Sequence, residues 1–179
     1  MKVIKLTLKA LPVIALATIG LCYLTQTVAK WFGIELPDQA NIEIVKRYLG
    51  WNWNFAFLCL QIIILLPAVE ELIFRFLLWR LPTRTLDKRQ ETEDEDGRKM
   101  EDGRLTNTAK VVAVVSSILF SAAHYIFQPW PDAAFIALFF FGLAQCWLYR
   151  KTDRLWCTIL NHGLFNLTNL VLLFILPEA

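Results

Sequence analysis

The sequence has 179 residues, of which 56% are hydrophobic, and its mean hydropathy is +0.46. A chain of this size and composition is about one domain long and too apolar to be an ordinary soluble domain. Its formal net charge is only +2 and its charged residues are confined to a few loops, so the composition indicates no nucleic-acid partner. We therefore predict an all-α fold, a polytopic membrane helix bundle that forms one membrane domain over residues 1–179.

Five apolar segments are long enough, or nearly so, to cross the lipid bilayer as helices. We expect the first to be a retained span, with a cleaved signal peptide ending at Thr27-Val28-Ala29 as the alternative. The second contains Pro67 and must tilt, kink or project beyond the bilayer. The leading span covers residues 10–29, and the core spans cover residues 53–79, 111–127, 133–149 and 155–176.

Two polar segments interrupt this pattern. Residues 31–52 predict a loop that contains a short interfacial helix over residues 42–49. Residues 81–109 carry dense charge and few apolar side chains, which cannot offset the entropy lost when a chain becomes ordered. We expect a mobile cytoplasmic connector there, with a docking site for a partner as the less favoured interpretation.

The basic residues are distributed unequally between the two sides that five spans define. Fourteen of the 18 Lys and Arg fall on the side of the N-terminus, three fall on the other side, and Arg75 lies within a span. Because Lys and Arg favour cytoplasmic loops, this asymmetry predicts a cytoplasmic N-terminus and an external C-terminus.

The second span contains ionisable residues, which are costly in hydrocarbon and normally mark a functional site or an internal ion pair. Glu71 and Arg75 are four residues apart, so they share one helix face and can form a pair. Glu70 points about 100° away from that face and needs a polar partner from another helix.

Both histidines of the chain, His124 and His162, also fall inside predicted spans, and His162 shares a helix face with Asn166. At about 1.5 Å per residue, Glu70 and Asn166 lie at similar depths, whereas His124 lies deeper than His162 unless its helix is tilted or begins outside the hydrocarbon. We predict that these side chains form one polar cluster from three helices.

A carboxylate, two imidazoles and a carboxamide are sufficient to hydrolyse an amide. Glu70 is suited to act as a general base toward water, and His124 can hold the same water. His162 and Asn166 can donate hydrogen bonds to the oxyanion that forms at the carbonyl. Three serines lie near His124 in the sequence: Ser116, Ser117 and Ser121. Their small hydroxyls are better explained by helix packing than by a role as nucleophile.

The ordered set of polar motifs resembles the signature of the CPBP family, which contains the CaaX proteases and the bacteriocin-processing enzymes and is also called Abi. The motifs lie on separate spans and read Glu70-Glu71-x-x-x-Arg75, Phe120-x-x-x-His124 and His162-x-x-x-Asn166. This resemblance implies an intramembrane glutamic-type endopeptidase that uses no cofactor and no metal.

By this resemblance, Glu70 and His124 activate water, and His162 and Asn166 form the oxyanion site. The second acid and the arginine of the first motif brace the site. The chain is shorter than the eukaryotic CaaX proteases, so we do not expect prenylated CaaX substrates. We expect a membrane peptide or protein as substrate, in peptide maturation, self-immunity or membrane-protein processing at a bacterial plasma membrane.

Two other interpretations remain open. A zinc-dependent protease would use the ligand atoms of Glu70, Glu71, His124 and His162, although the sequence has no His-Glu-x-x-His motif. A non-catalytic scaffold of the same fold would present the connector to a partner. The four cysteines lie in or beside apolar spans without paired-ligand spacing, so we predict neither a disulfide framework nor a zinc knuckle.

Overall fold

The computed structural model describes residues 2–36, 45–48, 52–90, 107–126 and 132–175. Within these ranges all regular structure is helical. Three of the described helices are long and apolar enough to cross a membrane, at Lys2–Trp31, Trp53–Thr85 and Leu155–Ile175, and Asn107–Ala123 is apolar but shorter. The chain is therefore an all-α membrane helix bundle, as predicted, whereas the number of five spans remains a prediction.

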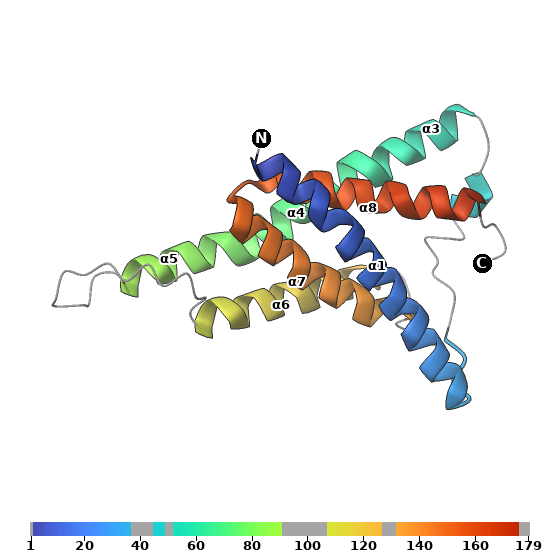
Figure 1. Cartoon of the computed structure of the whole chain (residues 1–179), viewed down its shortest axis with the longest axis horizontal. Helices are drawn as coiled ribbons and strands as arrows, with labels where there is room; N and C mark the ends of the chain where they lie inside the picture. Colours follow the sequence, from blue (N-terminus) through green and yellow to red (C-terminus); the bar gives the residue numbers. More distant parts are fainter. Residues whose placement is uncertain (1, 37–44, 49–51, 91–106, 127–131, 176–179) are drawn as a thin grey trace.

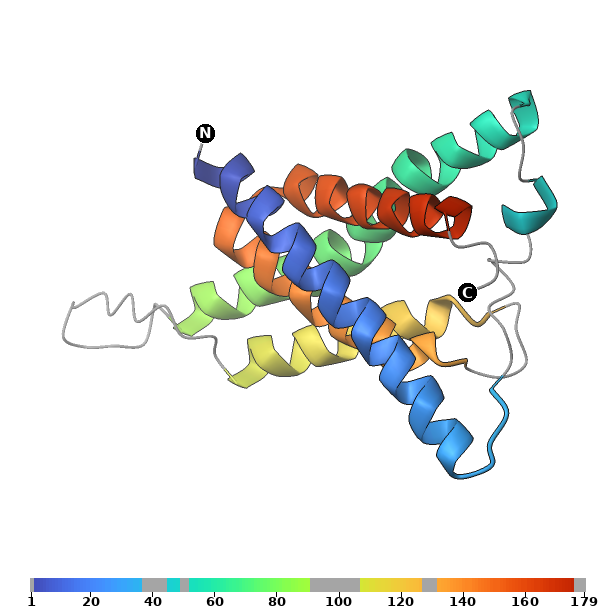
Figure 2. The same cartoon turned by 45° about the vertical axis from the view of Figure 1, so that its right-hand side comes forward.

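The elements follow one another as a bundle of crossing helices (Figures 1 and 2). A single helical turn at residues 45–48 lies between the first two labelled helices. In chain order the elements are α1 (Lys2–Trp31), α3 (Trp53–Leu60), the π-helix η1 (Gln61–Leu65), α4 (Leu66–Glu71), the π-helix η2 (Leu72–Arg80), α5 (Leu81–Gln90), α6 (Asn107–Ala123), α7 (Ala134–Thr152) and α8 (Leu155–Ile175).

The core forms where α1 crosses α7 and α8, and where α6 packs against α7 and η2. Small and β-branched residues line the buried face of α1, which lets its backbone come close to its neighbours. This face packs on aromatic and aliphatic side chains of the other helices. The buried cluster contains Ala10, Ile14, Ala15, Phe120, Phe141, Leu148 and Phe165.

The second predicted span is one helical run from residue 53 to residue 90, interrupted by two π segments. In η1 the Leu66 N–H donates to the Gln61 carbonyl, five residues earlier. Pro67 follows and has no N–H to donate. The Ile62 carbonyl is thereby left without its usual backbone donor, and the helix passes the proline by widening its hydrogen-bond pattern.

This run extends beyond the predicted end of the span. Residues 81–90 form α5, whereas the sequence assigned them to the mobile connector; residues 91–106 lie outside the described residues. Arg80 and Arg84, one helical turn apart, both donate to Oδ1 of Asp153 in the α7–α8 turn, at 2.5 and 2.9 Å. This contact joins the end of η2 and the start of α5 to a distant part of the chain.

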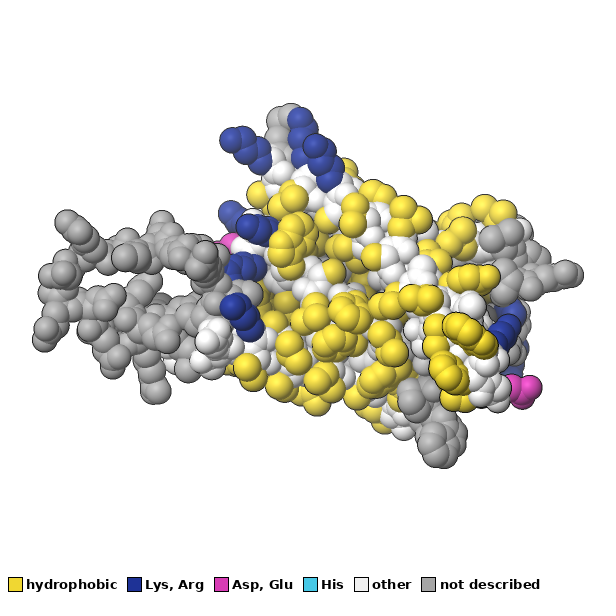
Figure 3. Space-filling model, turned by 60° about the horizontal axis from the view of Figure 1, so that its bottom comes forward, with side chains coloured by type: hydrophobic (Ala, Val, Ile, Leu, Met, Phe, Trp, Pro, Cys, Tyr) yellow, Lys and Arg dark blue, Asp and Glu magenta, His cyan; other side chains and the backbone are white. Residues whose placement is uncertain are grey.

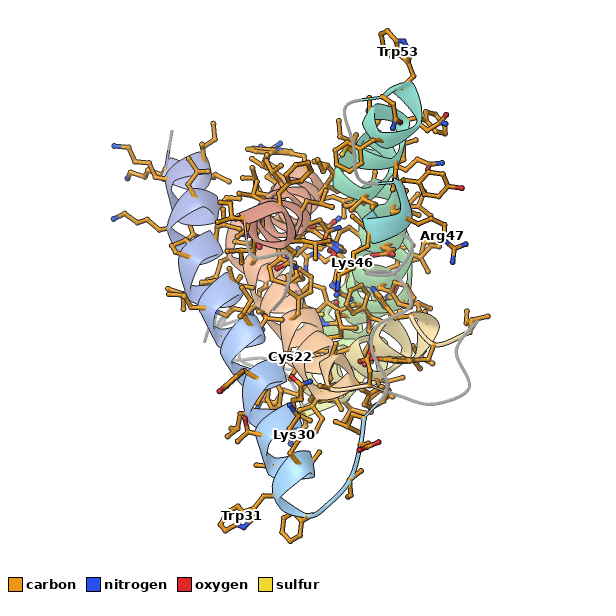
Figure 4. All side chains as sticks on the ribbon, turned by 90° about the vertical axis from the view of Figure 1, so that its right-hand side faces the viewer. Cys22, Lys30, Trp31, Lys46, Arg47 and Trp53 are labelled. Carbon is orange, nitrogen blue, oxygen red and sulfur yellow. The ribbon has the colours of Figure 1, made fainter. Side chains whose placement is uncertain are left out.

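The face seen in Figure 3 is broadly apolar and has a basic end. Lys and Arg gather beside a broad hydrophobic surface in Figure 3, on the side where α5 lies. The N-terminal end of α1, the start of α6 and the α7–α8 turn lie at that same end (Figures 1 and 2). Trp31 and Trp53 project outward from the ends of α1 and α3 (Figure 4) and are 86% and 90% exposed, as suits indoles at a membrane interface.

The Asp153 contact predicts a pH-dependent contribution to stability. Burial raises the pKa of Asp153, but the hydrogen bonds and charge of Arg80, and then of Arg84, outweigh it and hold the pKa below its ordinary value of 3.8. The carboxylate therefore stabilises the fold above that pH, and its contribution is lost as the pH falls through the lowered pKa. Because Asp153 is 55% exposed, we expect Asp153→Asn to cost about 0.2–1 kcal/mol at neutral pH.

Asparagine tolerates the left-handed backbone of this position, where φ is 48°, so the substitution removes the charge without adding backbone strain. Thermal unfolding in detergent measures the difference between wild type and Asp153→Asn. The difference should shrink when the pH is lowered from about 7 to about 3. An equal difference at both pH values would contradict the ion-pair explanation.

Candidate active site

The two acids of the first motif end α4, between the two π segments. Glu71 is fully buried, whereas the side chain of Glu70 is 26% exposed. Wide helical turns of this kind occur often at functional sites, because they change which face of the helix presents each side chain. Both acids themselves lie on α4, where successive residues point about 100° apart, so the neighbouring carboxylates have different environments.

Glu71 and Arg75 form the ion pair that their spacing predicts. Their Oε2 and Nε atoms are 3.4 Å apart, and both side chains are fully buried. The guanidinium carbon of Arg75 also lies 4.6 Å from the centre of the Phe120 ring, within the range of a cation–π interaction. The arginine therefore connects the acid pair to α6.

His162 of α8 lies between both carboxylates. Its Nδ1 is 3.0 Å from Oε1 of Glu71, and its Nε2 is 3.5 Å from Oε2 of Glu70. An ionised carboxylate only accepts hydrogen bonds, so the Nδ1 hydrogen is directed at Glu71. The rings of Phe120 and Phe141 pack against the imidazole in T-shaped arrangements, at ring-centre distances of 5.9 and 5.0 Å. Packing and hydrogen bonding together fix the orientation of this ring.

His124 lies in the turn that follows α6. Its Nδ1 is 2.9 Å from the Phe120 carbonyl, which can only accept, so Nδ1 carries the hydrogen and Nε2 of the neutral ring has a free lone pair. The Phe120 ring contacts both imidazoles, at 4.8 Å from His124 and 5.9 Å from His162. Between residues in the described part of the chain, no hydrogen bond or ion pair joins Glu70 directly to His124.

Asn166 lies one turn beyond His162 on α8. Its Nδ2 donates to the Ile62 carbonyl at 2.9 Å, the carbonyl that Pro67 leaves without a backbone donor. The sequence analysis did not predict this contact, because side-chain patterns do not show which main-chain carbonyl lacks a donor. The one available indication was Pro67, a proline inside an apolar helix.

The serines near His124 serve helix packing, as the sequence indicated. Ser116 Oγ donates to the Phe74 carbonyl at 2.5 Å, which joins α6 to η2. Ser121 Oγ donates to the Phe135 carbonyl at 2.6 Å, which joins α6 to α7. Among the described residues, no three His, Cys, Asp or Glu side chains are grouped so that they could hold one metal ion.

Because the Glu71–Arg75 pair is buried, we expect removal of one partner to destabilise the protein more than removal of both. Arg75→Met leaves the buried Glu71 carboxylate without its cation, so we expect a loss of about 3–5 kcal/mol. The double variant Glu71→Gln/Arg75→Met should recover part of this loss, because no buried charge remains unpaired. Unfolding in mixed micelles of SDS measures both.

The matched control is Arg84→Met, since the Arg84 side chain is 45% exposed and its surface ion pair is worth less than about 1 kcal/mol. If Arg75→Met proves no more destabilising than Arg84→Met, Arg75 does not neutralise a buried charge.

Comparison with known proteins places the chain in a family. A family model described as Type II CAAX prenyl endopeptidase Rce1-like matches residues 52–168, which is more than half of the chain and includes all the motif residues. No curated protein and no solved structure matches the chain. This protein therefore belongs to the Rce1-like type II CAAX prenyl endopeptidases, a family of membrane peptidases within the CPBP group.

Proposed function

We propose that this protein is an intramembrane endopeptidase in which Glu70 activates water to hydrolyse a peptide bond of a membrane-associated peptide or protein. The observation that carries the proposal is the position of His162 between the two carboxylates of Glu70 and Glu71, inside the helix bundle of a peptidase family. A buried cluster of this kind is costly, and structural pairing alone accounts for Glu71 but not for Glu70.

Glu70 is the general base of this reaction. Its partial exposure, 26%, lets its carboxylate meet water while remaining inside the bundle. The carboxylate takes a proton from water, and the resulting hydroxide forms a bond to the carbonyl carbon of the substrate. The tetrahedral intermediate then breaks its C–N bond, and Glu70 returns the proton to the leaving amine, so the enzyme ends in its starting state.

In this proposal His124 holds the attacking water together with Glu70. Its Nδ1 is committed to the Phe120 carbonyl, so the Nε2 lone pair accepts one hydrogen of the water. This contact orients the oxygen toward the substrate. Water, rather than a direct bond, links Glu70 to His124 in this mechanism.

His162 and Asn166 stabilise the oxyanion. For this role His162 needs a hydrogen on both ring nitrogens: Nδ1 donates to Glu71, and Nε2 donates toward the reacting oxygen. The Asn166 amide carries two hydrogens, of which the Ile62 carbonyl accepts one, so the second is available for the oxyanion. Glu71 and Arg75 act as positioning residues, because they reach the reaction only through His162.

The proposal predicts that Glu70→Gln abolishes proteolysis while the protein still folds. A carboxamide cannot take the proton from water, so we expect a loss of about 100-fold or more, and a smaller loss for His124→Ala. Mass spectrometry of membrane peptides from cells that produce the wild type or Glu70→Gln identifies the cleaved peptide. The purified protein in liposomes is then tested on that peptide.

Glu35→Gln is the control, because this exposed acid lies outside the cluster. A chelator is added in a second arm, and loss of cleavage there with recovery on zinc addition would favour the metal-dependent alternative. Unchanged cleavage by Glu70→Gln, or a cellular phenotype that survives both Glu70→Gln and His124→Ala, would overturn the proposal in favour of a non-catalytic scaffold.

A further inference from the structure

We propose that Gly163 is a positioning residue, whose bare backbone lets α8 dock on η1, where Pro67 leaves the Ile62 carbonyl without a backbone donor. The docking itself follows from backbone geometry, while its effect on catalysis rests on the proposed function. The contact sets the position of His162, the neighbour of Gly163, relative to the acid pair.

On η1, the contact involves a main-chain carbonyl that has no hydrogen-bond donor within its own helix. The Leu66 N–H is bonded to Gln61 and Pro67 has no N–H, so the Ile62 carbonyl has no backbone donor at either helical spacing. Asn166 Nδ2 bonds to the Ile62 carbonyl at 2.9 Å. A second helix thus supplies what the proline removed.

The α8 side of this contact requires glycine. A Cβ at position 163 would overlap with the carbonyl oxygen of Ile63, a backbone atom that cannot rotate away. Gly163 is buried, so the added methyl group has no free space to occupy. Any side chain there pushes α8 away from η1 and draws Asn166 from Ile62.

The catalytic cluster tolerates little of this displacement. The Nε2 of His162 is already 3.5 Å from Glu70, near the outer limit of a polar contact, and its Nδ1 is 3.0 Å from Glu71. A shift of α8 therefore weakens both contacts at once. A misplacement of about 1 Å at a reacting group can cost about 100-fold in rate.

The experiment compares four single substitutions to alanine, three at glycines and one at Pro67, in the whole chain. Gly163→Ala tests the docking, and Pro67→Ala tests it without adding bulk, because it restores an N–H that can compete with Asn166 for the Ile62 carbonyl. Gly142→Ala controls for lost packing, since its Cβ would press on Ser117 of α6 at 2.9 Å. Gly20→Ala is the neutral control, because a Cβ there meets nothing within 4 Å.

The chain contains only two histidines, so the nitrogen NMR spectrum of protein labelled at the histidine rings reports on His124 and His162 separately. We expect Gly163→Ala and Pro67→Ala to shift the ring nitrogen signals of His162 and to leave those of His124 in place. With the peptide identified above, we expect kcat to fall about tenfold or more while KM changes little. Gly142→Ala should lower the melting temperature and keep kcat close to the wild-type value.

The spectrum needs no substrate, so it separates the two proposals. If the wild type cleaves nothing but His162 shifts in both variants, the proposed function fails and the docking stands. If His162 keeps its wild-type signals in Pro67→Ala and in any folded Gly163→Ala, the docking inference is overturned, whatever the activity.

Discussion

Burial of the Glu71 carboxylate is the constraint on which the rest of the site depends. A fully buried ion must be matched by opposite charge and by hydrogen-bond donors, or the bundle does not form. Arg75 supplies the charge from the next turn, and His162 supplies a donor from α8. Because Arg75 also lies against the Phe120 ring, one carboxylate draws three helices together. The fold and the candidate active site therefore share the same contacts.

Pro67 shows how a local defect becomes a tertiary contact. In a regular helix every main-chain carbonyl is satisfied internally, and nothing on the backbone can recognise a neighbour. The proline and the π segment expose the Ile62 carbonyl just before the acid pair, and Asn166 bonds to it. The helical run that carries both acids therefore also helps to position α8.

The helices, the Glu71–Arg75 pair and the family could be predicted from the sequence, because they depend on apolar runs, on i,i+4 spacing and on short motifs. The π segments could not be predicted, because the hydrophobic pattern does not show whether a carbonyl bonds to the N–H four or five residues later. The contact of α5 with Asp153, 69 positions beyond Arg84, could not be predicted either, because it joins residues far apart in the sequence. Likewise, the rotation of α8 that directs His162 at both acids arises from packing between helices, which spacing within one helix does not contain.

The different environments of the two adjacent acids follow from helix geometry. Successive residues differ by about 100° around the axis and only about 1.5 Å along it, so neighbours occupy different faces at nearly the same depth. Glu71 points into the core and is sealed by Arg75, whereas Glu70 lies at the margin of the core with 26% of its side chain exposed. A separation of four residues would place both acids on one face and bury both. Adjacency gives one imidazole the buried acid Glu71 on Nδ1 and the partly exposed acid Glu70 on Nε2.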